Sequence, residues 1–237
     1  MSDSAFLLLH SPLLGPVSWH PARDELTARG ERAAVPNLVD SVTGRGPHIP
    51  AIARSVLQAV DGVGQPLTLV AHSGAGALAP AVVATAPDAF AAAVFVDATL
   101  PYPGRSWFES APADLGDRLR VLADHEGVLP PWHTWFGPDA IAELVPDPAT
   151  RAALCADIPR VPLSYLAETA PTELGWQAVP TCYLRLSDAY LDAEAVAAGK
   201  GWPTATLPDA HHLSGYTEPG RVVTAVESLL DELRALT

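Results

Sequence analysis

A serine stands between two stretches whose residue types predict a strand and a helix. Residues 67–71 (LTLVA) are mostly apolar, and the helix-forming run AGALAPAVVATA follows Ser73. Ala71, Gly74 and Gly76 are small, so the backbones around the serine can approach closely in a sharp turn. Such a turn places the hydroxyl at the carboxyl end of a sheet, where the N–H of Gly74 and the helix dipole favour a developing negative charge. The pattern predicts Ser73 as a nucleophile.

A serine hydroxyl is a weak nucleophile at neutral pH and needs a base, which in turn needs a carboxylate to orient it. Two adjacent histidines near the end of the chain, His211 and His212, are candidate bases. Asp97 directly follows the apolar run AAVFV, and Asp188 follows the run TCYLRL, with Asp192 as a further option. An ionised Asp97 beside a buried strand would need a strong partner, which an imidazolium would provide. We favour Asp97 over Asp188 as the acid and leave the alternative open.

The elements that must position these residues alternate between strands and helices. Short apolar runs predict buried strands, and runs with one apolar face predict helices. The alternation predicts an α/β fold with a mostly parallel, doubly wound sheet of about six strands. The expected strands are 5–9, 67–71, 92–96, 181–186 and 204–207, with a strand and loop at 32–38. The expected helices are 19–28, 49–60, the stretch after Ser73, and 221–236.

The stretch 101–176 breaks this alternation. It carries several prolines and four tryptophans, with helical pieces expected at 113–122, 138–144 and 148–156. We therefore expect a helical cap at 101–176, inserted into an α/β core made of 1–100 and 177–237. The tryptophans either wall an apolar pocket or join the cap to the core, and the second role is expected for most of them.

The chain resembles the α/β-hydrolase superfamily along nearly its whole length. HSPLLGP with Trp19 resembles the oxyanion loop region, and AHSGAG resembles the nucleophile elbow, with Ala71 in place of the first glycine of G-x-S-x-G. VFVDATLP resembles the strand that leads into the cap, and HHLSGYTEP resembles the loop of the catalytic histidine. Within the superfamily the chain is similar to small capped members, such as the plant esterase and hydroxynitrile lyase group, and to uncharacterised bacterial hydrolases.

The resemblance implies roles for the histidines and the acids. In this superfamily a proline often follows the catalytic histidine by seven positions, and Pro219 stands at that distance from His212. His72 is expected to be structural, while His10 is expected to line the oxyanion loop. Asp188 takes the usual position of the acid but lacks the usual Gly-x-x-Asp turn. Haloalkane dehalogenases place their acid after the earlier strand, as at Asp97.

The resemblance also raises a question about the second donor to an oxyanion. In capped relatives the loop after the first strand runs His-Gly-x, and residue x supplies an N–H. Here the matching stretch is His10-Ser11-Pro12-Leu13, and proline has no N–H. We predict that Leu13 N–H takes this role. The alternatives are the Ser11 hydroxyl, or a reaction that does not pass through a full oxyanion.

Composition limits the classes of partner. The 237 residues are 49% hydrophobic, which favours one sizeable domain, and the net charge of -13 disfavours nucleic acid. The start MSDSAFLLLHSP has no basic leader region and no run reaches membrane-spanning length, so we expect no membrane association and a cytoplasmic location. Cys155 and Cys182 are expected to be free thiols, and no His or Cys pattern indicates a metal.

Together these features predict acyl transfer through an acyl-enzyme on Ser73, with no cofactor. The expected substrate is a small, fairly apolar ester, thioester, lactone or amide. One alternative is a lyase or cyclase that uses the same serine and histidine for proton transfer. Another is a ligand-binding protein that has kept the residues without turnover. The sequence leaves a homo-oligomer open.

Overall fold

The computed structural model describes residues 5–137, 140–172 and 175–236. In this part of the chain six strands form one parallel sheet in the order β2-β1-β3-β4-β5-β6. Residues 32–38, expected as a strand and loop, contain a strand of two residues, because Pro36 has no N–H to continue the ladder. The strands are β1 (Ala5–Leu9), β2 (Ala33–Ala34), β3 (Leu67–His72), β4 (Phe90–Val96), β5 (Thr181–Arg185) and β6 (Thr204–Thr206).

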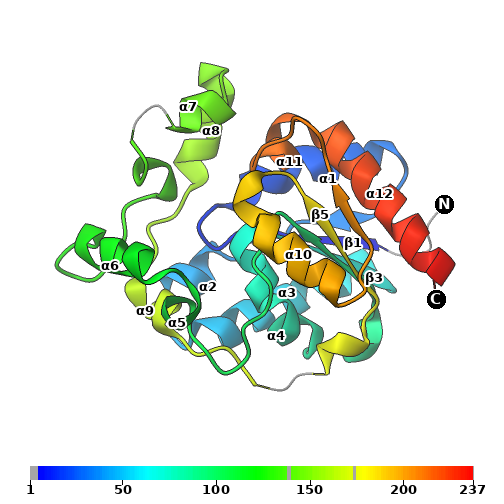
Figure 1. The fold of residues 1–237 in the computed structure, drawn as a ribbon, viewed down its shortest axis with the longest axis horizontal. Coiled ribbons are helices and arrows are strands. Elements are labelled where there is room, and N and C mark those ends of the chain that lie inside the picture. Colours follow the sequence, from blue (N-terminus) through cyan, green and yellow to red (C-terminus); the bar gives the residue numbers. More distant parts are fainter. Residues whose placement is uncertain (1–4, 138–139, 173–174, 237) are drawn as a thin grey trace.

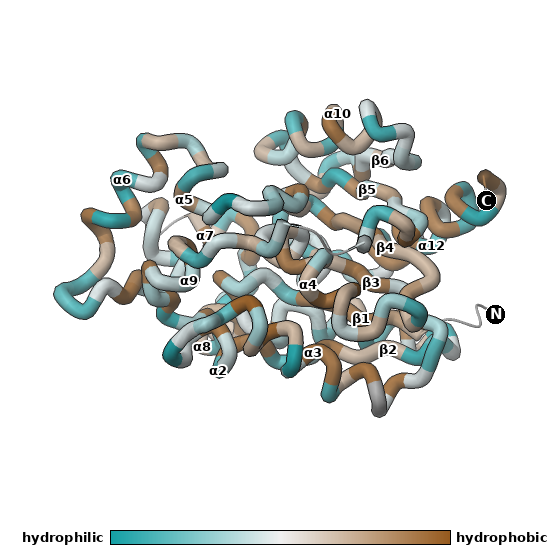
Figure 2. The backbone as a smooth tube through the Cα atoms, turned by 90° about the horizontal axis from the view of Figure 1, so that it is seen from below, coloured by the Kyte–Doolittle hydropathy of each residue, from teal (hydrophilic) through white to brown (hydrophobic). Residues whose placement is uncertain are grey.

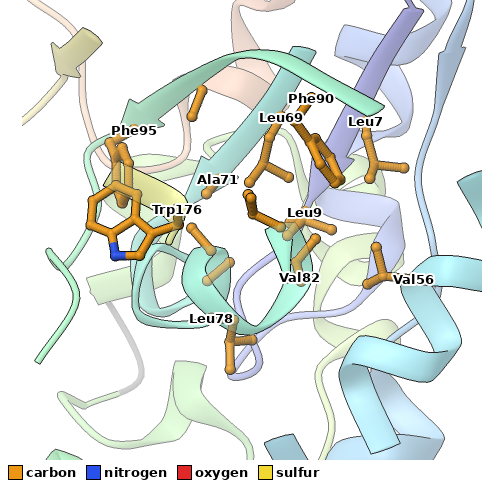
Figure 3. Packing of buried hydrophobic residues seen from close by; sticks show 14 of the residues in the cluster. Leu7, Leu9, Val56, Leu69, Ala71, Leu78, Val82, Phe90, Phe95 and Trp176 are labelled. Atoms are coloured by element: carbon orange, nitrogen blue, oxygen red, sulfur yellow. The ribbon is translucent and has the colours of Figure 1, made fainter. Parts of the chain in front are cut away.

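Helices cover both faces of this sheet (Figure 1). Successive strand side chains point to opposite faces, so each apolar strand feeds two layers of core. Phe6, Leu8 and Val70 pack on the face covered by α1 (His20–Ala28) and α12 (Pro219–Leu236). On the other face the strand side chains meet α3 (His48–Val63), α4 (Ala79–Val83) and α10 (Leu191–Gly199). Figure 3 shows this second layer, with Leu7, Leu9, Leu69, Phe95, Val56 and Val82 among its members.

Short helical elements join the main ones. The stretch after Ser73 is expected to be one helix, but it begins as a 3-10 helix and becomes α4 only at Ala79. Pro80 has no N–H to give to the carbonyl four residues earlier, which accounts for the break. The short elements of the core are η1 (Pro16–Trp19), α2 (Val39–Thr43), η2 (Ser73–Leu78), η3 (Pro87–Ala89), η5 (Trp176–Ala178), η6 (Asp188–Tyr190) and α11 (Ser214–Thr217).

Most of the described residues of the segment 101–176, called the cap segment below, lie at the end of the molecule away from the two termini (Figures 1 and 2), while Trp176 packs in the core beside Phe95. Within its described residues no strand joins the sheet. The expected helices at 113–122 and 148–156 are present, and of the one expected at 138–144 the first two residues lie outside the described ones. The helical elements of this segment are α5 (Trp107–Ser110), α6 (Ala113–Leu122), η4 (Trp132–Thr134), α7 (Ala140–Leu144), α8 (Pro148–Asp157) and α9 (Leu163–Ala167).

Two carboxylates of the cap segment bind backbone N–H groups at the starts of core helices. Asp157 Oδ2 accepts from Val17 N–H at 2.8 Å, at the beginning of η1. Glu168 accepts from the first N–H groups of α3, including Ile49 N–H at 2.9 Å. Gly15 makes the first contact feasible, because a Cβ there would lie 2.1 Å from Asp157 Oδ2. These carboxylates satisfy N–H groups that lack partners inside a helix, so they join the cap segment to the core.

Candidate active site

Ser73 lies in a strained turn directly after β3. Its φ is +56°, a left-handed value that costs energy for any residue other than glycine. Thr99 N–H donates to the Ser73 carbonyl at 3.0 Å, so the chain that leaves β4 holds the turn. A Cβ on Gly76 would lie 2.1 Å from the Thr99 carbonyl oxygen, so this close approach requires glycine. The turn places the side chain of Ser73 at the carboxyl edge of the sheet, with 8% of the residue exposed.

His212 lies between Ser73 and a carboxylate. Its Nε2 is 3.1 Å from Ser73 Oγ, and its Nδ1 is 2.7 Å from Asp97 Oδ2. Because a carboxylate only accepts, Nδ1 carries the proton and Nε2 is the acceptor for the serine hydroxyl. This is the arrangement of a nucleophile, its general base and the group that orients the base. The structure thus brings together the three residues favoured from the sequence.

Asp97 is fully buried and also has a positive φ, +44°. Its Oδ1 accepts N–H groups from Leu186 and Ser187, each at 2.9 Å, and its Oδ2 accepts the Ser187 hydroxyl at 2.6 Å. Burial alone would raise the pKa of Asp97, but the hydrogen bond and charge of His212, with those from Ser187 and Leu186, lower it below its ordinary value. The carboxylate is therefore ionised and held in place at neutral pH.

The alternative acid, Asp188, faces solvent. Its side chain is 89% exposed and pairs with Arg185 at 2.8 Å. Asp192 is exposed in the first turn of α10. The loop after β5 nevertheless contacts Asp97, because the Leu186 and Ser187 N–H groups donate to its carboxylate. The position that the resemblance gives to the acid thus supplies hydrogen-bond donors to Asp97.

The loop after β1 lies against Gly74. A Cβ on Gly74 would lie 3.5 Å from both Ser11 Oγ and Pro12 Cδ. Leu13 N–H, however, donates to Ser11 Oγ at 3.3 Å, so the predicted use of Leu13 as an oxyanion donor finds no support in this geometry. Ser11 Oγ accepts this bond and keeps its own proton for another acceptor. The local turn, which also directs Leu14 N–H to the Ser11 carbonyl, explains the difference.

His10 holds this loop from behind. Its Nε2 accepts Leu38 N–H at 3.0 Å, so Nδ1 carries the proton and donates to the Ser11 carbonyl at 2.9 Å. Burial lowers the pKa of His10 to about 4, which keeps the ring neutral. Both ring nitrogens are thus engaged with backbone, and His10 positions Ser11 rather than facing a substrate.

His72 and His211 also position the histidine loop. His72 Nε2 donates to the His212 carbonyl at 2.9 Å, and its ring meets the edge of Trp19. Burial first, and then the neighbouring His212, lower the pKa of His72 to about 3. These contacts give His72 a structural role in holding the loop that carries His212. His211 accepts Leu213 N–H on Nδ1 at 3.2 Å, so it serves the loop and not Ser73.

Two aromatic side chains complete the surroundings of His212. Tyr190, at the end of η6, has its hydroxyl 3.2 Å from Ser73 Oγ, and its ring lies parallel to that of His212, with centroids 5.3 Å apart. Trp132 of the cap segment has its ring 6.2 Å from the His212 ring. The sequence alone does not indicate this place for Tyr190, because only the acids of LSDAYLD are typical of a catalytic site. Its position just after the strand 181–186 is the available signal.

No family model and no curated protein matches the chain, but many solved structures match it. An extracellular α/β-hydrolase from a Paenibacillus species, described as homologous in structure and function to tobacco salicylic acid binding protein 2, has a TM-score of 0.76 at 20% identity over 96% of this chain and 99% of that one. This chain has the α/β-hydrolase fold.

Two further structures share the α/β-hydrolase fold with this chain. A pyrethroid hydrolase from Sphingobium faniae JZ-2 gives a TM-score of 0.68 at 19% identity, over 96% of this chain and 97% of its own. Tomato methylketone synthase I, in complex with 2-tridecanone, gives 0.72 at 13% identity over 98% and 100%. Since this fold hosts many reactions, the chemistry must be argued from the site.

The α/β-hydrolase fold brings Ser73, Asp97 and His212 together from three loops. Ser73 follows β3, Asp97 follows β4, and His212 lies between β6 and α11. Within the described residues, no group of three or more His, Cys, Asp or Glu side chains is placed to hold a metal ion. Among the described helices, none combines the length and apolar character needed to cross a membrane.

Proposed function

We propose that this protein is a serine hydrolase that forms an acyl-enzyme on Ser73. The observation that carries the proposal is the chain of hydrogen bonds from Ser73 Oγ through His212 to Asp97. His212 Nε2 takes the serine proton as Oγ attacks the acyl carbon, and Asp97 stabilises the resulting imidazolium. The buried, ionised carboxylate suits this role because a positive ring beside it is favoured.

The rest of the cycle follows from the same atoms. The tetrahedral intermediate collapses as His212 gives its proton to the leaving group, and the acyl chain remains on Ser73. His212 then takes a proton from water, which attacks the acyl carbon, and the acid is released as Ser73 regains its proton. No step requires a cofactor.

The proposed oxyanion donors are Gly74 N–H and the Ser11 hydroxyl. Gly74 is the second residue of η2, so its N–H belongs to the first turn, where a helix provides no acceptor. Ser11 Oγ lies close to Gly74 and accepts from Leu13 N–H, which orients its own proton away from that bond. A side-chain hydroxyl would thus replace the N–H that Pro12 lacks.

The surroundings favour a small and fairly apolar acyl substrate. Only 8% of Ser73 is exposed, and the Trp132 ring lies near His212. The net charge of -13 would repel anionic substrates over long range. Esters, thioesters, lactones and amides all fit the chemistry, and a series of acyl chain lengths would rank them.

The test combines a fluorophosphonate probe with a panel of esters. Wild-type protein should be labelled on Ser73 and hydrolyse at least one ester, while Ser73→Ala should lose both and keep its circular dichroism spectrum. Ser228→Ala, on the exposed side of α12, is the matched control. Hydrolysis at the wild-type rate by Ser73→Ala would overturn the assignment, as would the absence of labelling in folded wild-type protein.

A non-hydrolytic lyase or cyclase remains a second candidate on one observation. The loop after β1 directs Leu13 N–H to Ser11 Oγ, and Pro12 has no N–H, so neither of these two residues offers a backbone donor for an oxyanion. A reaction that only moves protons between Ser73, His212 and substrate would need no such donor. Reaction in ¹⁸O-labelled water separates the two, because hydrolysis places the label in the acid product.

A further inference from the structure

Tyr190 is a second polar side chain at Ser73 Oγ, besides His212. Its hydroxyl lies 3.2 Å from Ser73 Oγ, about as close as His212 Nε2 at 3.1 Å. Burial raises the pKa of Tyr190 to about 12, so the phenol keeps its proton at neutral pH. The mechanism derived above, in which His212 alone serves the leaving group, does not use this hydroxyl.

The directions of the hydrogen bonds are set by the neighbours. His212 Nδ1–H is committed to Asp97, so Nε2 accepts the one proton of Ser73. The remaining contact, between Tyr190 and Ser73, must therefore have the phenol as donor. The phenol points a proton at Ser73 Oγ, where an ester would be attacked.

The stacking shows on which side of Ser73 this donor lies. The Tyr190 and His212 rings are parallel within 6°. The phenol therefore approaches Ser73 from the side of His212. A leaving group must depart on this side, because His212 Nε2 gives it a proton. Ser11, by contrast, lies against Gly74, where the oxyanion of the tetrahedral intermediate is proposed to form.

We propose that Tyr190 is a catalytic residue. Its hydroxyl shifts its hydrogen bond from Ser73 Oγ to the departing oxygen of an alkyl ester. The proposal rests on the hydrolase function proposed above. As the carbon–oxygen bond breaks, its electron pair goes to the departing oxygen, His212 transfers its proton there, and the phenol donates a hydrogen bond while retaining its own proton. The group would matter most for poor leaving groups, which carry the largest negative charge in the transition state.

The test is the leaving-group dependence of Tyr190→Phe, which keeps the stacked ring and removes only the hydroxyl. With one acyl chain, kcat/KM for an ethyl ester should fall on the order of 10- to 100-fold, the effect of one hydrogen bond to a developing charge. A p-nitrophenyl ester, whose leaving group needs no such help, should change by less than about 3-fold. Tyr216→Phe is the matched control, since its hydroxyl donates to the Thr150 carbonyl in the cap segment.

A second variant protects the test against a folding defect. Incorporation of 3,5-difluorotyrosine at position 190 keeps the hydroxyl and makes it a stronger donor, so the ratio of ethyl to p-nitrophenyl ester turnover should rise. Equal losses for both esters in Tyr190→Phe, or no loss for either, would overturn the proposal while Ser73-dependent hydrolysis remained. Absence of Ser73-dependent hydrolysis in the wild type would overturn both the function and this role.

Discussion

Acid should weaken the fold through the buried histidine His10. Burial lowers its pKa from 6.5 to about 4, so the folded protein keeps this ring neutral while the unfolded chain protonates it below pH 6.5. The free energy of unfolding is therefore independent of His10 above pH 6.5 and falls as the pH drops towards 4. A difference of about 2.5 pKa units corresponds to roughly 3 kcal/mol, or about 1.4 kcal/mol per pH unit.

His72 acts in the same direction. Burial, followed by the neighbouring His212, lowers its pKa to about 3, so it too stays neutral in the folded protein at pH values where the unfolded chain is protonated. The two histidines together give a slope of about 2.7 kcal/mol per pH unit between pH 6 and pH 4.5. Since domains have only about 5–15 kcal/mol of stability, a large part of it should be lost in this range.

The assay is urea unfolding, followed by tryptophan fluorescence at pH 7.5, 6 and 5. His10→Gln is the variant, because a glutamine amide can accept from Leu38 N–H and donate to the Ser11 carbonyl, as the imidazole does. Its free energy of unfolding should fall about 1.4 kcal/mol less per pH unit than that of the wild type. His125→Gln, which removes an exposed imidazole, is the matched control. Parallel curves for wild type and His10→Gln would refute the reasoning.

Two further predictions concern the site. Asp97→Asn should lower kcat by about three to four powers of ten, because the wrong tautomer of His212 is favoured, whereas Asp188→Asn should change kcat by less than about 3-fold. Steady-state kinetics on one ester checks this, and the reverse order would move the acid to Asp188. Ser11→Ala should lower kcat about 10²- to 10³-fold with little change in KM, as loss of an oxyanion donor does. An unchanged kcat for Ser11→Ala would show that a group other than the Ser11 hydroxyl is the second oxyanion donor.

Much of the fold and part of the site follow from local sequence. The strands 5–9, 67–71 and 92–96 are short apolar runs with both faces buried, and the structure confirms them. The turn at Ser73 could be predicted because small residues must surround it, as the contact between Gly76 and the Thr99 carbonyl now explains. The preference for Asp97 has a physical reason, since a carboxylate after a buried strand needs partners, and the structure shows four hydrogen bonds to it from Leu186, Ser187 and His212.

The features that the sequence does not predict depend on loop geometry and on contacts between distant parts of the chain. The helix α10 was not expected, because Leu191 and Val196 are about half exposed and no single apolar face marks it. The place of Leu13 N–H depends on the turn geometry of a loop whose conformation no periodicity encodes. Tyr190 reaches Ser73 only because β5 and β3 both end at the carboxyl edge, with β4 between them.

Two carboxylates of the cap segment bind the starts of core helices, and this limits how far the segment can change in shape independently of the core. Asp157 and Glu168 belong to the cap segment in sequence, yet they complete the helix starts at Val17 and Ile49 of the core. A cap of different shape, acquired by insertion or grafted in the laboratory, would leave those N–H groups without acceptors unless it carried equivalent acids. Exchange of the whole segment should therefore cost stability, whereas substitutions within it that keep Asp157 and Glu168 leave these helix starts intact.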